Sequence, residues 1–373
     1  MVEEEFRIVQ FEEKYFEQLK QLIRDGWNVN HILQKSDALL RWQYTGFGQM
    51  GGMKLPLLFH GDKMIGFRLM IPIEISLSNK DGVKTIVPSA VSTLFYVDAN
   101  YRGMKLGLKL QLYTIEHYGG YFAIASNLKT SAPIYKKSGA KMLDTMYRYF
   151  RPLVNDISPL VVSDCGKEWN CSDTKRILEP CNIGAKDLAK GWNKFVDGQN
   201  ITSLNRSEEF FKWRYIESPI YQYHFFGDKN EGGYVVGRIC DLYDESLKKT
   251  GKRVFRVLEI IPANRGVWNR EIDKTLSSLI DGVCGWAKVQ GCISAEFYMS
   301  TSRLGHIMSL AGFEEINKEE SIASSIMSYF EPMSLSHRLS NVSLQSDKVP
   351  DDFDFEDSYF TLSDADQDRP NIL

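Results

Sequence analysis

The chain has 373 residues, of which 43% are hydrophobic and 25% carry a charge. This length exceeds what one ordinary core needs, so two globular domains are expected. The formal charge of −3 gives no electrostatic basis for binding nucleic acid or an anionic membrane, which argues against both classes of partner.

Targeting and redox signals favour a cytoplasmic protein. No apolar run is long enough for a transmembrane helix, and the acidic segment Met1–Glu5 is unlike a signal peptide. The six cysteines form no Cys-x-x-Cys pair, and no histidine lies at zinc-site spacing from them. We therefore expect free thiols and no metal site.

Strands and helices alternate along the first 155 residues. Apolar runs and turn residues predict the following order: a strand at 6–10, a helix ending near Gly26, a helix at 31–44, strands at 55–59, 64–77 and 85–97, a helix at 108–118, a strand at 121–126, a short helix at 132–138 and a strand at 146–153. This order predicts an α/β (α+β) fold, with a mixed, mostly antiparallel sheet flanked by helices.

Several segments of the first half recur in the same order in the second half. Ser36–Tyr44 is echoed by Ser207–Tyr215, and Ala99–Gly103 by Ala263–Gly266. Tyr149–Pro152 matches Tyr329–Pro332. We interpret the chain as a tandem duplication of one fold. The predicted units are a first domain at 1–155, a second, degenerate domain at 156–333 and an acidic tail at 334–373.

The tail combines acidic and apolar residues. Aromatic and aliphatic side chains between 353 and 362 predict that residues 352–363 dock as an extended segment. Asp364, Asp366 and Asp368 alternate beyond it and are interpreted as a solvated acidic end.

An Arg-Gly-x-x-x-Gly turn, Arg102–Gly107, lies between a predicted strand and a predicted helix. Free backbone N–H groups at the positive end of a helix dipole suit a pyrophosphate. The second half has Arg265-Gly266 at this place, followed by Trp268 and no second glycine. Because a backbone close to a pyrophosphate tolerates bulky side chains poorly, we expect only the first half to bind phosphate.

Val97–Gly107 resembles the acetyl-CoA signature of the GNAT N-acyltransferase superfamily, Arg/Gln-x-x-Gly-x-Gly/Ala at a strand-to-helix turn. Asn127, with Ala132–Ala140 after it, resembles the second motif of that family. The resemblance covers about residues 6–153, and more weakly 185–333. Lys105 departs from the pattern, because it stands where the first motif glycine usually lies.

The resemblance implies acetyl-CoA or another acyl-CoA as co-substrate. Two strands would hold the pantetheine arm between them through main-chain groups, the turn would hold the pyrophosphate, and two side chains would lie near the pantetheine amide and the sulfur. The implied residues are, in that order, Phe95, Tyr96 and Val97; Arg102, Gly103, Met104, Lys105, Leu106 and Gly107; and Asn127 and Tyr135.

The chemistry of amide formation from a thioester requires two proton transfers. The attacking amine must lose a proton, and the departing thiolate needs one. Tyr135 is the candidate acid, with a packed aromatic ring as the alternative, and Asn127 could instead be a turn residue. Glu74 is the candidate base, although a solvated strand residue is the alternative. A water chain to bulk solvent could replace a base.

We therefore predict a cytoplasmic N-acyltransferase that moves an acyl group, acetyl by preference, to a primary amine in a ternary complex. Similarity to two-domain GNAT proteins of surface-polysaccharide pathways makes a nucleotide-linked amino sugar the preferred acceptor. The alternatives are an acyltransferase for protein lysine or an antibiotic amine, and a non-catalytic CoA-binding protein. The oligomeric state stays open.

Overall fold

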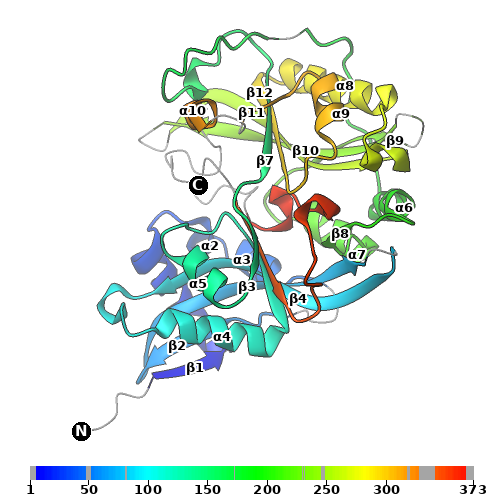
Figure 1. Cartoon of the computed structure of the whole chain (residues 1–373). Helices are drawn as coiled ribbons and strands as arrows, with labels where there is room; N and C mark the ends of the chain where they lie inside the picture. Colours follow the sequence, from blue (N-terminus) through cyan, green and yellow to red (C-terminus); the bar gives the residue numbers. More distant parts are fainter. Residues whose placement is uncertain are drawn as a thin grey trace.

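The computed structural model describes residues 6–47, 52–79, 82–171, 173–228, 230, 232–244, 248–316, 320–326 and 341–366. Two lobes are stacked on each other, and each is built on one β-sheet with helices packed against it (Figure 1). The predicted fold class is confirmed, because both sheets are mixed, mostly antiparallel and flanked by helices.

The first sheet lies in the lobe that contains the N-terminal half. Its main path runs β1-β2-β3-β4-β5-β14-β6, and β8 with β15 extends it beside β3. The strands of the path and extension are β1 (Phe6–Gln10), β2 (Pro56–His60), β3 (Lys63–Ser78), β4 (Lys84–Val97), β5 (Gly120–Ile124), β14 (Val342–Ser346), β6 (Lys141–Leu143), β8 (Thr202–Leu204) and β15 (Ser358–Tyr359).

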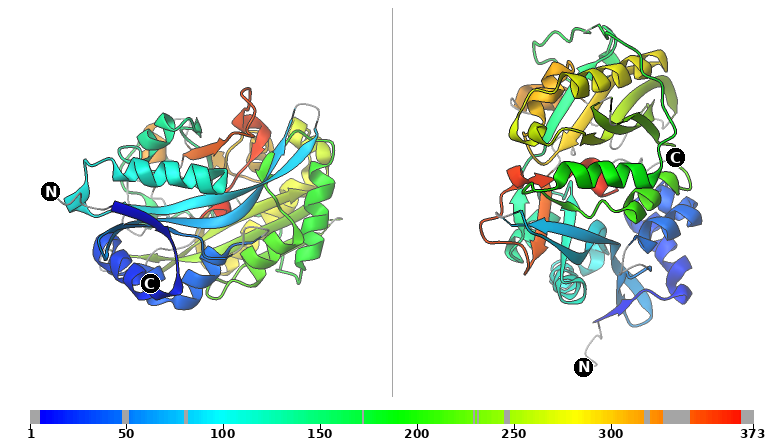
Figure 2. Two further views of the ribbon diagram at one scale, coloured as in Figure 1. Left: turned by 90° about the horizontal axis from the view of Figure 1, so that it is seen from below. Right: turned by 90° about the vertical axis from the view of Figure 1, so that its right-hand side faces the viewer.

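Helices cover both faces of this sheet (Figure 2). One face carries α1 (Phe16–Leu22), α2 (Ile32–Lys35) and α3 (Asp37–Thr45), and the other carries α4 (Leu106–Tyr118) and α5 (Ser131–Lys137). The single helix predicted at 31–44 is wrong, since it breaks at Ser36. There the backbone is extended and the Ser36 hydroxyl caps α3 by accepting from Leu39 N at 3.2 Å.

The second sheet has the order β13-β7-β12-β11-β10-β9. Its strands are β7 (Tyr147–Pro152), β9 (His224–Asp228), β10 (Gly233–Tyr243), β11 (Lys249–Pro262), β12 (Cys292–Met299) and β13 (Glu314–Glu315). The helices of this half of the chain are α6 (Ala185–Val196), α7 (Glu208–Phe211), α8 (Lys274–Val289), α9 (Gly305–Leu310) and α10 (Glu320–Ser325).

The two halves of the chain exchange a strand. β7 leaves the first half and pairs between β12 and β13, whereas β14 returns from the C-terminal part and pairs between β5 and β6 (Figure 1). Each exchanged strand buries apolar side chains in its host lobe, Phe150 in one case and Leu344 in the other. The predicted boundaries at 155 and 333 stay a prediction, and the expected counterpart Tyr329–Pro332 lies outside the described residues.

The repeated Trp-x-Tyr segments meet between the lobes. The Trp42 indole N–H donates to Trp213 O, and the Trp213 indole N–H donates to Trp42 O, both at 3.1 Å. The two rings stack with centroids 5.3 Å apart. Ser207 caps α7 through Phe210 N at 3.2 Å, as Ser36 caps α3. The contact between the two tryptophans is therefore reciprocal.

The C-terminal segment is packed into the protein up to residue 366. Tyr359 and Phe360 are fully buried, and β15 pairs in parallel with β8. Asp364 and Asp366 are also buried, which corrects their interpretation as a solvated end. The Asp364 carboxylate accepts from Arg206 Nη2 at 2.9 Å, which compensates part of its lost hydration. Asp368 lies outside the described residues.

Candidate acyl-CoA site

A tight turn connects β4 with α4. Asp98 starts it by accepting Asn100 N at 2.9 Å, and a short 3-10 helix, Ala99–Tyr101, follows. The backbone is left-handed at Gly103 (φ 87°) and again at Lys105 (φ 60°), the residue before α4. Lys105 thus has the backbone conformation that glycine adopts most easily, at the position where the GNAT pattern has glycine.

The turn leaves hydrogen-bond donors open. Within the described chain, the backbone N–H groups of residues 103–108 have no acceptor, and no side chain caps α4. Arg102, Lys105 and Lys109 are exposed and pair with no carboxylate among the described residues. Donors at a helix N-terminus, together with unpaired cations, form a site for an anion such as a pyrophosphate.

The corresponding turn of the second half is closed. Asp273 caps α8 by accepting Leu276 N at 2.9 Å, so a carboxylate already occupies that helix N-terminus. Arg265 pairs with Asp197, and the side chain of Trp268 is buried. A Cβ at Gly266 would lie 1.8 Å from Glu271 Oε2, so this carboxylate blocks the backbone. The two turns therefore differ in their charged side chains and in the room left beside the backbone.

β4 and β5 pair only briefly. Val91 faces Phe122 in parallel register, and no further pairing joins residues 92–97 to β5 within the described chain. β4 also bulges beside β3, because Arg68 pairs with Phe95 and Met70 pairs with Ser92. The result is an open strand edge that begins beside the turn and could hold an extended ligand through main-chain groups.

The three predicted strand residues lie along this edge but face different ways. Phe95 points toward α4 and α5, and a Cβ at Gly107 would lie 3.6 Å from its ring. Val97 packs beside α4 with the apolar cluster around Leu110. Tyr96 points to the opposite face, where a Cβ at Gly26 would lie 2.5 Å from Tyr96 Cζ.

Tyr135 lies on α5 at the far end of the same edge. Its side chain is buried, its hydroxyl lies 3.2 Å from Ser92 Oγ, and its ring centroid is 5.0 Å from that of Tyr121. The structure thus brings Tyr135 next to β4 at the bulge, in the same apolar cluster as Phe95. Its proximity to a thioester sulfur stays a prediction.

Asn127 and Glu74 have structural contacts. Asn127 Oδ1 accepts Lys129 N at 2.9 Å and Thr130 N at 3.1 Å, so this side chain holds the turn before α5. The Glu74 carboxylate accepts Asn205 Nδ2 at 2.8 Å near β8. Glu74 lies six positions along β3 from Arg68, which corresponds to about 20 Å along a strand. The structure does not bring Glu74 to Tyr135.

The sequence analysis missed Arg68 and the polar residues around it. Arg68 is fully buried on β3, where its Nε donates to Ser92 Oγ at 3.1 Å and its Nη1 donates to Gln111 Oε1. The available signal was a charged residue within the apolar run Gly66–Met70, because arginine is rarely buried without a reason.

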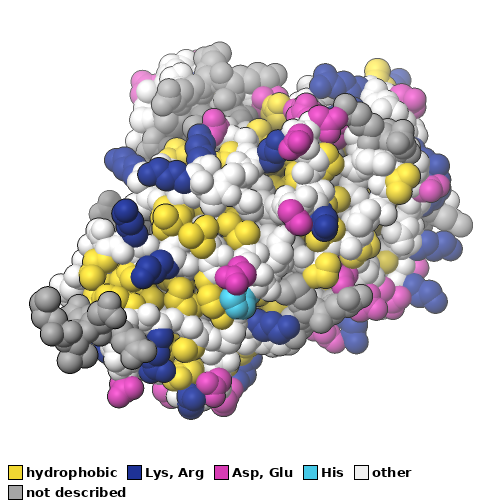
Figure 3. Space-filling view, turned by 60° about the horizontal axis from the view of Figure 1, so that its bottom comes forward, with side chains coloured by type: hydrophobic (Ala, Val, Ile, Leu, Met, Phe, Trp, Pro, Cys, Tyr) yellow, Lys and Arg dark blue, Asp and Glu magenta, His cyan; other side chains and the backbone are white. Residues whose placement is uncertain are grey.

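The face that bears β1, β2 and α4 shows a band of hydrophobic side chains with Lys and Arg side chains along it (Figure 3). Met104, in the turn, is 46% exposed, and Leu128, after β5, is 61% exposed. The turn thus presents apolar surface beside its cations at the protein surface.

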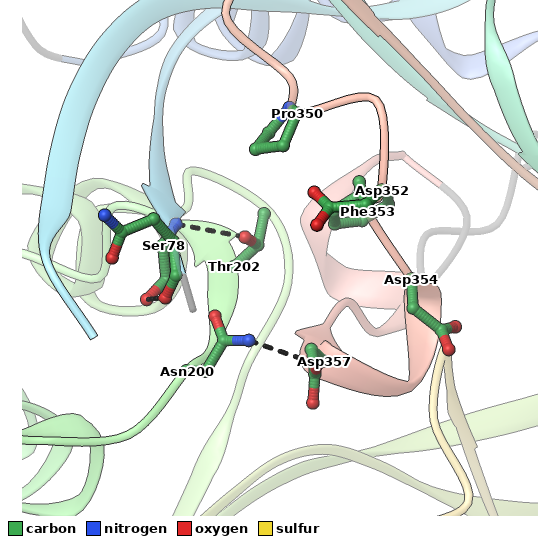
Figure 4. Close-up of a pocket in the computed structure, with 9 residues that line it drawn as sticks. Ser78, Asn200, Thr202, Pro350, Asp352, Phe353, Asp354 and Asp357 are labelled. Carbon is green, nitrogen blue, oxygen red and sulfur yellow. Dashed lines mark hydrogen bonds between the residues drawn. The ribbon is translucent and has the colours of Figure 1, made fainter. Parts of the chain in front are cut away.

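A cavity of about 260 Å³ lies elsewhere, between the C-terminal end of β3, the N-terminal end of β8 and the C-terminal segment (Figure 4). Ser78, at the end of β3, lines it about 30 Å along the strand from Arg68. Its walls include the carboxylates of Asp352, Asp354 and Asp357. This cavity is separate from the turn after β4.

The described residues contain neither a candidate metal-binding cluster nor a candidate membrane-spanning helix. No group of three or more His, Cys, Asp or Glu residues is arranged to hold a metal ion there. No helix among the same residues is long and apolar enough to cross a membrane.

Comparison with solved structures finds similar folds. The chain aligns with N-myristoyltransferase of Saccharomyces cerevisiae bound to myristoyl-CoA, with a TM-score of 0.53 and 11% identity over 92% of this chain and 83% of that chain. A GCN5-related N-acetyltransferase from Anabaena variabilis gives a TM-score of 0.51 and 10% identity over 79% of this chain, and the alignment spans 66% of that protein, just under two thirds.

A third match is a probable N-acyltransferase from Enterococcus faecalis, with a TM-score of 0.51 and 11% identity over 83% of this chain and 70% of that chain. No family model matches the sequence. No curated protein matches it either. At these identities the comparisons show that the chain has the fold of GNAT-type acyltransferases, and the activity has to be argued from the site.

Proposed function

We propose that this chain is an acyl-CoA-dependent N-acyltransferase with its acyl-CoA site in the first lobe. The observation that carries the proposal is the uncapped, cationic turn at Arg102–Gly107, which opens onto the unpaired edge of β4. A phosphate-bearing head at the turn and an extended arm along the edge would suit the shape of CoA.

Each residue of the site has a proposed role. The N–H groups of residues 103–107 and the side chains of Arg102 and Lys105 would hold the pyrophosphate. Main-chain groups of residues 95–97 would hold the pantetheine arm, and Tyr135 would give its hydroxyl proton to the leaving sulfur. Holding amine and thioester in line would supply much of the rate. Asn127 would act by fixing the turn before α5.

The transferred group and its acceptor are the finer part of the proposal. Acetyl remains the preferred acyl group, and the fold shared with N-myristoyltransferase makes a long acyl chain the second candidate. The preferred acceptor, a nucleotide-linked amino sugar, rests on the sequence resemblance alone. Thiol release should therefore be measured with acetyl-CoA and myristoyl-CoA against amino sugars, lysine peptides, aminoglycosides and a peptide with a free N-terminal glycine.

Titration calorimetry with CoA tests the site itself. Because an arginine–phosphate contact is a charge-assisted hydrogen bond, Arg102→Ala or Lys105→Glu should weaken CoA binding about tenfold or more. Arg265→Ala is the matched control, since Arg265 has the same place in the closed turn of the second half, and it should leave the affinity unchanged. Failure of the wild-type protein to bind CoA would refute the proposal.

The rival hypothesis is a protein that binds CoA without catalysis. Thiol release separates the two, because binding without release of CoA with any donor and acceptor of the panel would favour the rival. Equal weakening of CoA binding by Arg102→Ala and Arg265→Ala would instead mean that the turn after β4 is not the site.

A further inference from the structure

Arg68 is a buried cation without a carboxylate partner in the described chain. Its guanidinium lies 4.8 Å from the ring centre of Tyr121, 5.1 Å from that of Phe95 and 5.3 Å from that of Tyr135. Burial lowers the pKa of the guanidinium, and its Nη2 atom has no hydrogen-bond partner among the described residues. Burying such a group costs stability unless it is fully paired, so a role beyond folding would explain it.

Two chains of hydrogen bonds lead from Arg68 to Tyr135. In the first, Arg68 Nε donates to Ser92 Oγ at 3.1 Å, and Ser92 Oγ lies 3.2 Å from the Tyr135 hydroxyl. In the second, Arg68 Nη1 donates to Gln111, Gln111 Nε2 donates to Ser138 Oγ at 3.0 Å, and Ser138 Oγ donates to Tyr135 O at 2.9 Å. The Arg68 side chain is thus connected both to the hydroxyl and to the backbone carbonyl of Tyr135.

The arginine fixes the direction of the first hydrogen bond of this series. A guanidinium can only donate, so Ser92 Oγ accepts from Arg68 and its own hydrogen is free to be donated to the Tyr135 oxygen. When Ser92 donates in this way, the hydroxyl hydrogen of Tyr135 stays available for another acceptor. This arrangement prepares the phenol to donate a proton.

The fold does not require this arginine. The second sheet builds a similar bulged strand pair, and the last pair before its bulge is Val236 with Glu259, where the first sheet has Arg68 with Phe95. A valine therefore satisfies the same position in a lobe whose phosphate turn is closed. The arginine occurs in the lobe with the open turn.

We propose that Arg68 is a positioning residue for acyl transfer, which acts through Ser92 to direct the hydroxyl of Tyr135 toward the leaving sulfur of an acyl thioester. The proposal rests on the proposed function. In the step, the amine nitrogen forms a bond to the carbonyl carbon and the carbon–sulfur bond breaks. The sulfur leaves with the electron pair and takes the Tyr135 proton, and the proton lost by the amine restores the phenol.

A double-mutant cycle tests this coupling. Acetyl-CoA turnover is followed by thiol release with the best acceptor of the panel, under single-turnover conditions with enzyme in excess so that slow variants can be measured. Ser92→Ala should lower the rate constant about tenfold in the wild-type background, with the KM for acetyl-CoA within twofold in steady state. In the Tyr135→Phe background the same change should have an effect below twofold, because the hydroxyl that Ser92 directs is gone.

Matched variants separate positioning from packing. Ser89→Ala removes another buried hydroxyl of β4, one without a hydrogen-bond partner in the described chain, and should leave the rate unchanged. Arg68→Met should reproduce the loss seen with Ser92→Ala. Arg68→Lys should restore little, since lysine lacks the planar fork that reaches Ser92 and Gln111 together.

The possible outcomes are distinct. An equal loss from Ser92→Ala in both backgrounds would overturn the positioning role while leaving the acyltransferase proposal intact. A loss from Ser89→Ala as large as that from Ser92→Ala would also overturn it. If the wild-type protein binds CoA but releases no thiol with any donor and acceptor, both proposals fail. Should Arg68→Met not fold, the cycle with Ser92→Ala decides alone.

Discussion

Lys105 shows how one residue can keep a motif while departing from its pattern. Its φ of 60° is left-handed, a conformation that costs residues other than glycine about 1 kcal/mol or more. The GNAT pattern has glycine here because glycine adopts this conformation without strain. The lysine keeps the backbone geometry and adds a cation beside the open N–H groups.

The stability cost of Lys105 can be measured. Lys105→Gly should raise the free energy of unfolding by about 0.5–1 kcal/mol, because it relieves the left-handed strain. Lys109→Gly, an exposed position four residues later within α4, should instead lower it by about 1 kcal/mol. Urea unfolding of both variants gives the comparison. Destabilisation by both would contradict strain at Lys105.

His31 predicts a pH dependence of stability. It is buried, its Nδ1 accepts Leu33 N at 3.2 Å to cap α2, and burial lowers its pKa to about 4. The folded protein therefore binds this proton less readily than the unfolded chain, whose histidine has a pKa of about 6.5. The stabilisation is complete above pH 6.5 and is lost as the pH falls toward 4, by up to about 3 kcal/mol.

Comparison with His31→Asn isolates this contribution, because asparagine can cap α2 and does not titrate. Urea unfolding of the wild-type protein and the variant between pH 4 and 7.5 should give stability curves that are parallel above pH 6.5. At lower pH the wild-type protein should lose more stability. Parallel curves over the whole range would mean that His31 titrates alike in both states.

At the scale of elements, the two strand-to-helix turns differ in whether their backbone N–H groups are open to an anion. The helices α4 and α8 follow these turns and have 13 and 16 residues. Asp273 caps α8 and supplies a fixed negative charge, whereas α4 starts without a cap after Lys105. The sequence pattern predicted this difference from Trp268 and the missing glycine. The structure shows in addition that the carboxylates of Asp273 and Glu271 occupy the turn of the second half.

At the scale of the whole molecule, the exchange of β7 and β14 ties the lobes together. Each lobe needs a strand that the other half of the chain supplies, so neither sheet is complete alone. The reciprocal bonds of Trp42 and Trp213 lie between the same two units. These features predict that both lobes unfold together, and the duplication stays a prediction from the sequence.

Leu344→Ala tests this cooperativity. Leu344 is fully buried on β14, so the substitution should destabilise the protein by about 2–5 kcal/mol. Calorimetry should show one transition at a lower temperature for the whole chain. Leu112→Ala, at an exposed position of α4, should change the stability by less than about 0.5 kcal/mol. Two separate transitions for Leu344→Ala would contradict the coupling of the lobes.

The sequence by itself determined the local elements and the turn between β4 and α4. Apolar periodicity and turn residues act over a few positions, so β1, the long strand pair β3 and β4, and α4 lie close to where the pattern predicts them. The same local logic located Arg102–Gly107 and Tyr135. It failed at Ser36, where a side-chain cap interrupts the helical pattern.

Only the tertiary structure decided which distant residues meet. The pattern of Tyr147–Pro152 is that of a buried strand in either sheet, so it carries no information on the exchange. The same holds for Asp364, whose burial depends on Arg206 more than 150 residues earlier. Arg68, Ser92 and Tyr135 lie on three elements, and their hydrogen bonds exist only because the bulged β4 packs against α5. Long-range pairing, and not local propensity, built that part of the site.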